Sequence, residues 1–119
     1  MVFESLRGIF VDVLPKLHAA VDNGAEYTLN TLAPSPLAQH KGAPLFFGSV
    51  RKGKGYVSFH LFPLYTCPEL RDGMSPELAK RMQGKSCFNF KTTPSTGQIA
   101  ELKELTRAGM RAFEQKDWA

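Results

Sequence analysis

The sequence places three polar side chains with hydrogen-bonding chemistry at a spacing of two residues. Tyr56, Ser58 and His60 alternate with apolar residues in the stretch 56–61, which is the pattern of a half-buried β-strand. Successive side chains of a strand point to opposite faces of its sheet, so the phenol, hydroxyl and imidazole groups share one face. An imidazole beside hydroxyl groups can donate a hydrogen bond, accept one or bind a metal ion.

A β-hairpin is expected to position this polar row. Two apolar, aromatic-rich runs flank a short basic turn at 51–55, which contains two glycines. Ser49 on the first strand is expected near Ser58 on the second, where the two hydroxyl groups suit a cross-strand hydrogen bond better than a nucleophile. The alternative that His60 only satisfies a neighbouring backbone or hydroxyl group stays open. We predict a ligand-binding surface formed by four residues, Ser49, Tyr56, Ser58 and His60.

Catalysis is not the chemistry that these residues favour. A Ser-His-acid triad needs a nucleophile on a strained turn and a carboxylate that orients the imidazole. The sequence has no Gly-x-Ser-x-Gly motif and no acid in the central hairpin, so it leans against an enzyme, and no catalytic residue or cofactor is predicted. No metal site is predicted either, because no two of the candidate ligands fall at ligand spacing. These candidates are His18, His40, His60, Cys67 and Cys87.

The turn of the central hairpin forms a basic tip of Arg51, Lys52 and Lys54. Such a tip can bind a phosphate group or an acidic partner, although a solvated turn at the end of a sheet has the same composition. The net charge of +4 and the pI of about 9.2 fall short of the concentrated basic stripe of a DNA-binding domain. Nucleic acid is therefore a less favoured partner.

Length and composition indicate one globular domain over residues 1–119. The 43% hydrophobic and 22% charged residues are ordinary for a soluble protein. The chain opens without a basic n-region, and no apolar run approaches the roughly 20 residues that span a bilayer. Cys67 and Cys87 match no zinc or redox motif. We expect a cytoplasmic protein without a membrane partner.

Local patterns predict the first half of the fold. An i, i+3, i+4 stripe of apolar residues predicts an amphipathic helix over 3–13. The turn signal at 22–24 favours a short hairpin of 16–22 against 26–32, with a helical alternative for 16–22 left open. Residues 33–43 hold two prolines and a glycine, so they predict a loop.

Capping residues define the two later helices. Ser75, followed by a proline and an acid, predicts a helix start, and Gly84 is expected to end that helix in a left-handed conformation. A short strand is expected over 87–91, and the spacing of Ser95 to Gln98 fits a capping box at the start of the last helix. The prediction is an α+β domain, ordered α-β-β-β-β-α-β-α, with one mostly antiparallel five-stranded sheet packed by N-terminal and C-terminal helices.

Four segments together carry a resemblance to a known family. They are Phe46-Phe-Gly-Ser-Val50, Tyr56-Val-Ser-Phe-His-Leu61, Ser75-Pro-Glu-Leu78 and Arg81-Met-Gln-Gly-Lys-Ser-Cys-Phe-Asn-Phe90. Over roughly 26–115 the chain resembles the YdhG-like family of small bacterial domains, which belong with YjbR-like and frataxin-like proteins in one fold group. The family is largely of unknown function, and some members are described as iron chaperones by analogy with frataxin. Frataxin-type iron binding relies on a run of acids on the first helix and neighbouring strand, whereas this first helix carries only Glu4 and Asp12.

Three functions follow as hypotheses. The favoured one is a non-enzymatic module that binds a small ligand or a protein in a groove between the polar face of the sheet and the loop 33–43. The alternatives are a frataxin-like iron or metal chaperone, and a binder of nucleic acid or acidic protein through the basic tip. A homodimer is left open, and the sequence does not identify the ligand.

Overall fold

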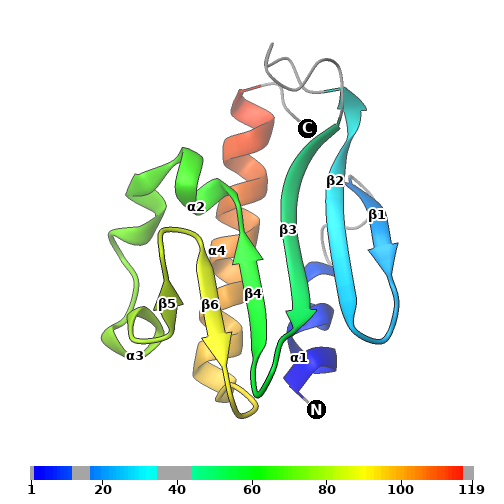
Figure 1. The fold of residues 1–119 in the computed structure, drawn as a ribbon. Coiled ribbons are helices and arrows are strands. Elements are labelled where there is room, and N and C mark those ends of the chain that lie inside the picture. Colours follow the sequence, from blue (N-terminus) through cyan, green and yellow to red (C-terminus); the bar gives the residue numbers. More distant parts are fainter. Residues whose placement is uncertain (1, 12–16, 35–43, 117–119) are drawn as a thin grey trace.

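The computed structural model describes residues 2–11, 17–34 and 44–116, and within them the α+β prediction is confirmed. A six-stranded antiparallel sheet has the strand order β1-β2-β3-β4-β6-β5 (Figure 1). The strands are β1 (Leu17–Asp22), β2 (Glu26–Pro34), β3 (Pro44–Lys52), β4 (Val57–Leu61), β5 (Met82–Gln83) and β6 (Cys87–Phe90). The helices are α1 (Val2–Phe10), α2 (Pro63–Thr66), the 3-10 helix η3 (Pro68–Arg71), α3 (Pro76–Ala79) and α4 (Thr96–Gln115).

Helices α1 and α4 pack side by side against one face of the sheet, behind the strands in Figure 1. The apolar stripe predicted for the first helix is confirmed, because all four of its described members are buried; they are Phe3, Leu6, Ile9 and Phe10. The helix ends at Phe10, and Val13, the fifth predicted member of the stripe, lies outside the described residues. Phe59 of β4 also faces this core, where its ring stacks on Phe10 with centroids 4.8 Å apart. We call the opposite face of the sheet, away from α1 and α4, the outer face.

The hairpin of β1 and β2 confirms the strand interpretation of the segment whose helical alternative was left open. Asn23 closes its turn, because the side-chain oxygen accepts hydrogen bonds of 2.8 Å from the backbone amides of Ala25 and Glu26. The register shifts between Ala19 and Val21, so a β-bulge at Ala20 reverses which side chains point to which face.

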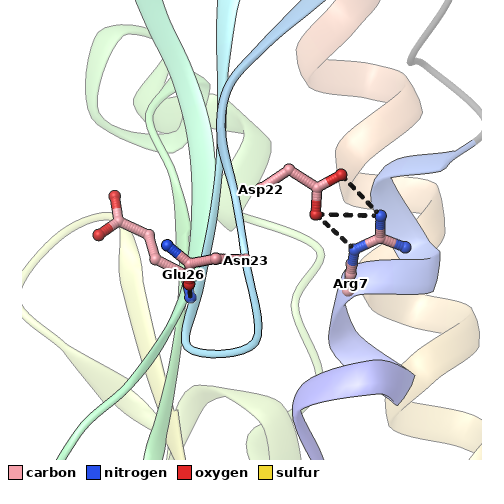
Figure 2. A network of polar contacts seen from close by, with 4 residues as sticks. All are labelled: Arg7, Asp22, Asn23 and Glu26. Carbon is pink, nitrogen blue, oxygen red and sulfur yellow. Dashed lines mark hydrogen bonds and ion pairs between the residues drawn. The ribbon is translucent and has the colours of Figure 1, made fainter.

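The bulge allows β1 to contact α1. Asp22 points to the helix side, where its carboxylate accepts from Arg7 Nη2 at 3.0 Å and Nε at 3.3 Å. Figure 2 shows this pair on one side of the hairpin and the carboxylate of Glu26 on the other. Because the side chains of Arg7 and Asp22 are both substantially exposed, their ion pair contributes at most about 1 kcal/mol to the free energy of unfolding. Its clearer role is to orient α1 against the sheet.

A second register shift, between β2 and β3, exchanges the faces of Phe46 and Phe47 relative to the alternation that starts from Ser49. Phe47 is fully buried and meets Phe113 of α4 edge-on with centroids 5.2 Å apart. Phe46 instead lies on the outer face, 5.1 Å from the ring of His60. A bulge of this kind adds one residue to a strand and so breaks the simple alternation of faces.

The helix predicted to run from Ser75 to Gly84 is shorter than expected, and the sheet has six strands instead of five. The start is confirmed, since the Ser75 hydroxyl accepts from the Leu78 amide at 3.2 Å and a proline follows. The helix ends at Ala79, and Met82–Gln83 pair with the free edge of β6. Gly84 has the predicted positive φ, 77°, but it turns the chain between β5 and β6 and does not cap a helix.

The last helix begins as predicted. The Ser95 hydroxyl accepts from the Gln98 amide at 3.1 Å, and the Gln98 side chain accepts from the Ser95 amide at 3.0 Å, which completes the capping box. Helix α4 then buries one side against α1 and the sheet. Within the ranges given above, the helices are all too short or too polar to cross a lipid bilayer.

Candidate ligand-binding site on the outer face

Two rows of polar side chains cross the outer face. Each row runs over β2, β3, β4 and β6, because the register pairs its members directly across neighbouring strands. The first row is Thr28, Ser49, His60 and Cys87, and the second is Glu26, Arg51, Ser58 and Asn89. Both rows thus come from alternate positions of strands whose other side chains form the core.

These rows line a hollow of about 390 Å³, which we call the cleft. Its volume lies within the range of small-molecule sites. Its lining residues are Glu26, Thr28, Phe46, Ser49, Arg51, Ser58, His60 and Cys87. The lining combines hydroxyl groups, one imidazole, one thiol, one ion pair and one aromatic ring.

His60 lies half-buried in the middle of the cleft. Its Nε2 atom is 2.8 Å from the hydroxyl oxygen of Ser86, in the turn between β5 and β6, so one ring nitrogen has a protein partner. Burial lowers the pKa of His60 below its ordinary value, and the nearby positive charge of Arg51 lowers it further. The imidazole is therefore neutral at pH 7, when one ring nitrogen donates and the other accepts.

The charged side of the cleft is formed by Glu26 and Arg51, which face each other on β2 and β3. Arg51 Nε lies 3.5 Å from Glu26 Oε1, and the other carboxylate oxygen accepts from the Thr28 hydroxyl at 2.6 Å. The Arg51 side chain is 66% exposed, so the rest of its guanidinium is accessible to an anionic group of a ligand.

Cys87 and Ser58 lie on the side of the cleft formed by β4 and β6. Burial is the main cause that raises the pKa of the Cys87 thiol, while a hydrogen bond to Ser58 acts in the opposite direction. Cys87 therefore stays protonated at neutral pH and acts as a small, weakly polar wall. The Ser58 hydroxyl donates to Asn89 Oδ1 at 2.8 Å.

The predicted binding residues are brought together only in part. Ser49, Ser58 and His60 all line the cleft, with Ser49 directly opposite His60 and Ser58 opposite Arg51. Tyr56 lies in the turn before β4 and is 39% exposed, and it lines a separate hollow. Its ring packs over Gly53, where an added Cβ would lie 2.6 Å from the Tyr56 ring.

The basic tip is divided between the two faces of the sheet. Arg51 lies on the outer face beside Glu26. Lys52 points to the opposite face, where its ammonium lies 5.4 Å from the ring centroid of Phe3. Lys54 is exposed in the loop that joins β3 and β4. The three charges therefore do not act as one compact patch.

Several cleft residues were missed because they come from strands outside the central hairpin. Glu26 and Thr28 alternate with buried Tyr27 and Leu29 in the sequence, so their common face was predictable. Their position beside the hairpin was not, because local alternation does not give the order of strands. In the described part of the chain, no three side chains of His, Cys, Asp or Glu are grouped as a metal ion would require.

Comparison of the chain with protein-family models, with curated proteins and with solved structures finds no match. The resemblance to the YdhG-like family accordingly stays a prediction.

Proposed function

We propose that this protein is a non-enzymatic binding module that holds a small polar ligand in the cleft. The single observation that carries the proposal is the convergence of hydroxyl groups, a neutral imidazole and an accessible guanidinium on one concave surface. Converging polar groups of this kind fix the orientation of a ligand, whereas a purely structural sheet face has no need of a hollow.

The lining indicates the character of the ligand. Ser49 supplies a hydroxyl group that can donate or accept. The Thr28 and Ser58 hydroxyls already donate to Glu26 and Asn89, and they offer lone pairs that accept from hydroxyl or amide groups of a ligand. Arg51 suits a carboxylate or another planar anion at one side. The ring of Phe46 supplies an apolar wall at the His60 side. A compact polar metabolite with at least one acidic group satisfies all three features.

The arrangement around His60 favours binding over catalysis. A general base in a nucleophilic site is oriented by a third group, most often a carboxylate. The carboxylate that lines the cleft, Glu26, is instead engaged by Thr28 and Arg51. His60 is fixed by the neutral hydroxyl of Ser86. These contacts support a role for the imidazole in hydrogen bonding with a ligand.

A thermal-shift screen of acidic metabolites with a blocked variant tests the proposal. Thr28→Trp fills the cleft with a residue that strands accept well, and His18→Trp places the same side chain at an exposed position of β1 outside the cleft. The proposal expects compounds that raise the melting temperature of the wild type and of His18→Trp, but not that of folded Thr28→Trp. A screen without such compounds, or with shifts that persist in Thr28→Trp, contradicts it.

A further inference from the structure

A second hollow on the outer face gathers three cations. It measures about 260 Å³ and we call it the cationic hollow. Its lining residues are Tyr56, Lys80, Arg81, Gln83, Asn89 and Lys91. None of them is an acid, so the positive potential of the hollow is not neutralised by its own walls.

The sheet register explains why these cations meet. The backbone amide of Asn89 donates a hydrogen bond of 2.8 Å to the backbone carbonyl of Arg81, which places Arg81 beside β6. Lys91 follows Asn89 by two residues, and Lys80 lies between the end of the short helix α3 and Arg81. Segments that lie about ten positions apart in the sequence, near residues 80 and 90, are thus held together by the pairing of β5 with β6.

The three cations are available to a ligand. Lys80, Arg81 and Lys91 are all exposed, and none forms an ion pair with a residue of the described ranges. Glu77 borders an adjacent hollow together with Lys80 and Arg81. Like charges gathered without a partner repel one another, and a multivalent anion relieves that repulsion.

Neutral donors complete the hollow. Gln83 and Asn89 supply side-chain amides, and Tyr56 supplies a phenol. Guanidinium, ammonium and amide donors around one anion are the usual partners of a phosphate group, which accepts through several oxygens at once. The dimensions suit a phosphate group and a few attached atoms.

The cationic hollow borders the cleft. Ser58 lines the cleft, Asn89 lines the cationic hollow, and their side chains are joined by a hydrogen bond of 2.8 Å. A single small molecule can therefore place one group on each side of this bond. We propose that the ligand is a phosphomonoester of a small polar molecule, with its phosphate in the cationic hollow and its polar body in the cleft. This inference rests on the proposed function for the position of the polar body, but not for the phosphate site.

Inorganic phosphate is the first probe of the cationic hollow. In a titration followed by ¹H–¹⁵N NMR at constant ionic strength, we expect saturable shifts of the amides of 80–83 and 89–91. The double variant Arg81→Gln, Lys91→Gln should weaken binding about tenfold, since each exposed charge contributes about threefold. Lys54→Gln removes one charge from the nearby turn and should change the affinity less than about twofold. Shifts that do not saturate, or equal losses in both variants, overturn the phosphate site.

Glycerol 3-phosphate, glycerol and a single-stranded oligothymidylate without terminal phosphates then distinguish the sources of phosphate. The proposal expects the monoester to bind at least as tightly as inorganic phosphate, and glycerol not to bind. Tighter binding of the oligonucleotide, with loss in the double variant, would overturn the small-molecule ligand in favour of nucleic acid. Thr28→Trp separates the two proposals, because it blocks the cleft and should leave the affinity for inorganic phosphate unchanged.

Discussion

Ser58 and Asn89 are joined by a hydrogen bond of 2.8 Å from the serine hydroxyl to the amide oxygen, at the border between the cleft and the cationic hollow. Because the oxygen of the amide accepts from Ser58, the amide group is held with its NH₂ as the donor. Ser58, a residue of the cleft, thereby fixes the orientation of the Asn89 side chain, which lines the cationic hollow.

The first prediction concerns this bond. Ser58→Ala and Asn89→Ala should each cost about 1 kcal/mol of unfolding free energy, the usual net value of one such bond. The double variant should cost less than the sum of the two, with a coupling energy of about 0.5–1.5 kcal/mol. Urea unfolding of the four proteins measures this, and strictly additive losses would show that the two side chains do not interact in solution.

The second prediction concerns the close approach of α1 to the sheet. A Cβ added at Gly48 would lie 2.8 Å from both the His60 carbonyl oxygen and Phe10 Cζ. Neither the strand backbone nor the stacked ring can move far, so Gly48→Ala should cost about 1–3 kcal/mol.

Gly8→Ala is the matched control for that substitution. Gly8 is exposed in α1 and has no atom within 4 Å of an added Cβ, so alanine there should stabilise the protein by up to about 1 kcal/mol. Thermal melts of both variants measure the loss of stability expected for Gly48→Ala and the gain expected for Gly8→Ala. A Gly48→Ala protein as stable as wild type would contradict the packing of Phe10 on this strand.

The third prediction concerns a buried hydroxyl group. Tyr27 is 1% exposed, and its OH has no hydrogen-bond partner among the residues that the structure describes. The guanidinium of Arg7 lies 4.5 Å from the centroid of its ring, an interaction that phenylalanine retains. Tyr27→Phe should therefore leave the unfolding free energy within about 0.5 kcal/mol of wild type or raise it. Chemical denaturation tests this, and a loss above about 1.5 kcal/mol would indicate a bonded hydroxyl.

The fourth prediction concerns pH. The pKa of His60 is lowered in the folded protein, first by burial and then by Arg51, so the unfolded chain takes up the proton at a higher pH than the folded one. Between those two pKa values the unfolded state binds more protons, and the free energy of unfolding rises with pH. The contribution is complete above the ordinary pKa of about 6.5 and is lost as the pH falls below it.

His60→Gln tests this pH dependence. The variant keeps a hydrogen-bonding side chain but does not titrate, so the fall in unfolding free energy between pH 7.5 and 5.5 should be smaller than in wild type. Denaturation curves at several pH values give both slopes. Equal slopes would show that His60 titrates alike in the folded and unfolded states.

Features fixed by neighbouring residues were predictable from the sequence. Ser75 with its following proline, and Ser95 with Gln98, gave correct helix starts because a cap involves only the first turn. The alternation at 56–61 correctly separated Phe59 from His60 for the same reason, since the period of a strand is local.

Features that depend on distant pairing were not predictable. Met82–Gln83 form a strand only because the edge of β6 is free to pair, and two residues carry no periodicity. The bulges beside Ala20 and Phe47 change which side chains share a face, and no local signal in the sequence marks them. Glu26, Thr28 and Cys87 were missed as cleft residues because they enter the cleft through the strand order.

The most direct test of the central claim is to map where a ligand binds. With the best compound from the thermal-shift screen, ¹H–¹⁵N NMR should show the largest amide shifts in β2, β3, β4 and β6 around Thr28, Ser49, Ser58 and His60. The exposed side of α4, around Glu104 and Arg107, should stay unchanged and serves as the internal reference. Shifts that concentrate on the helices and leave these four strands unperturbed would contradict a binding site on the outer face.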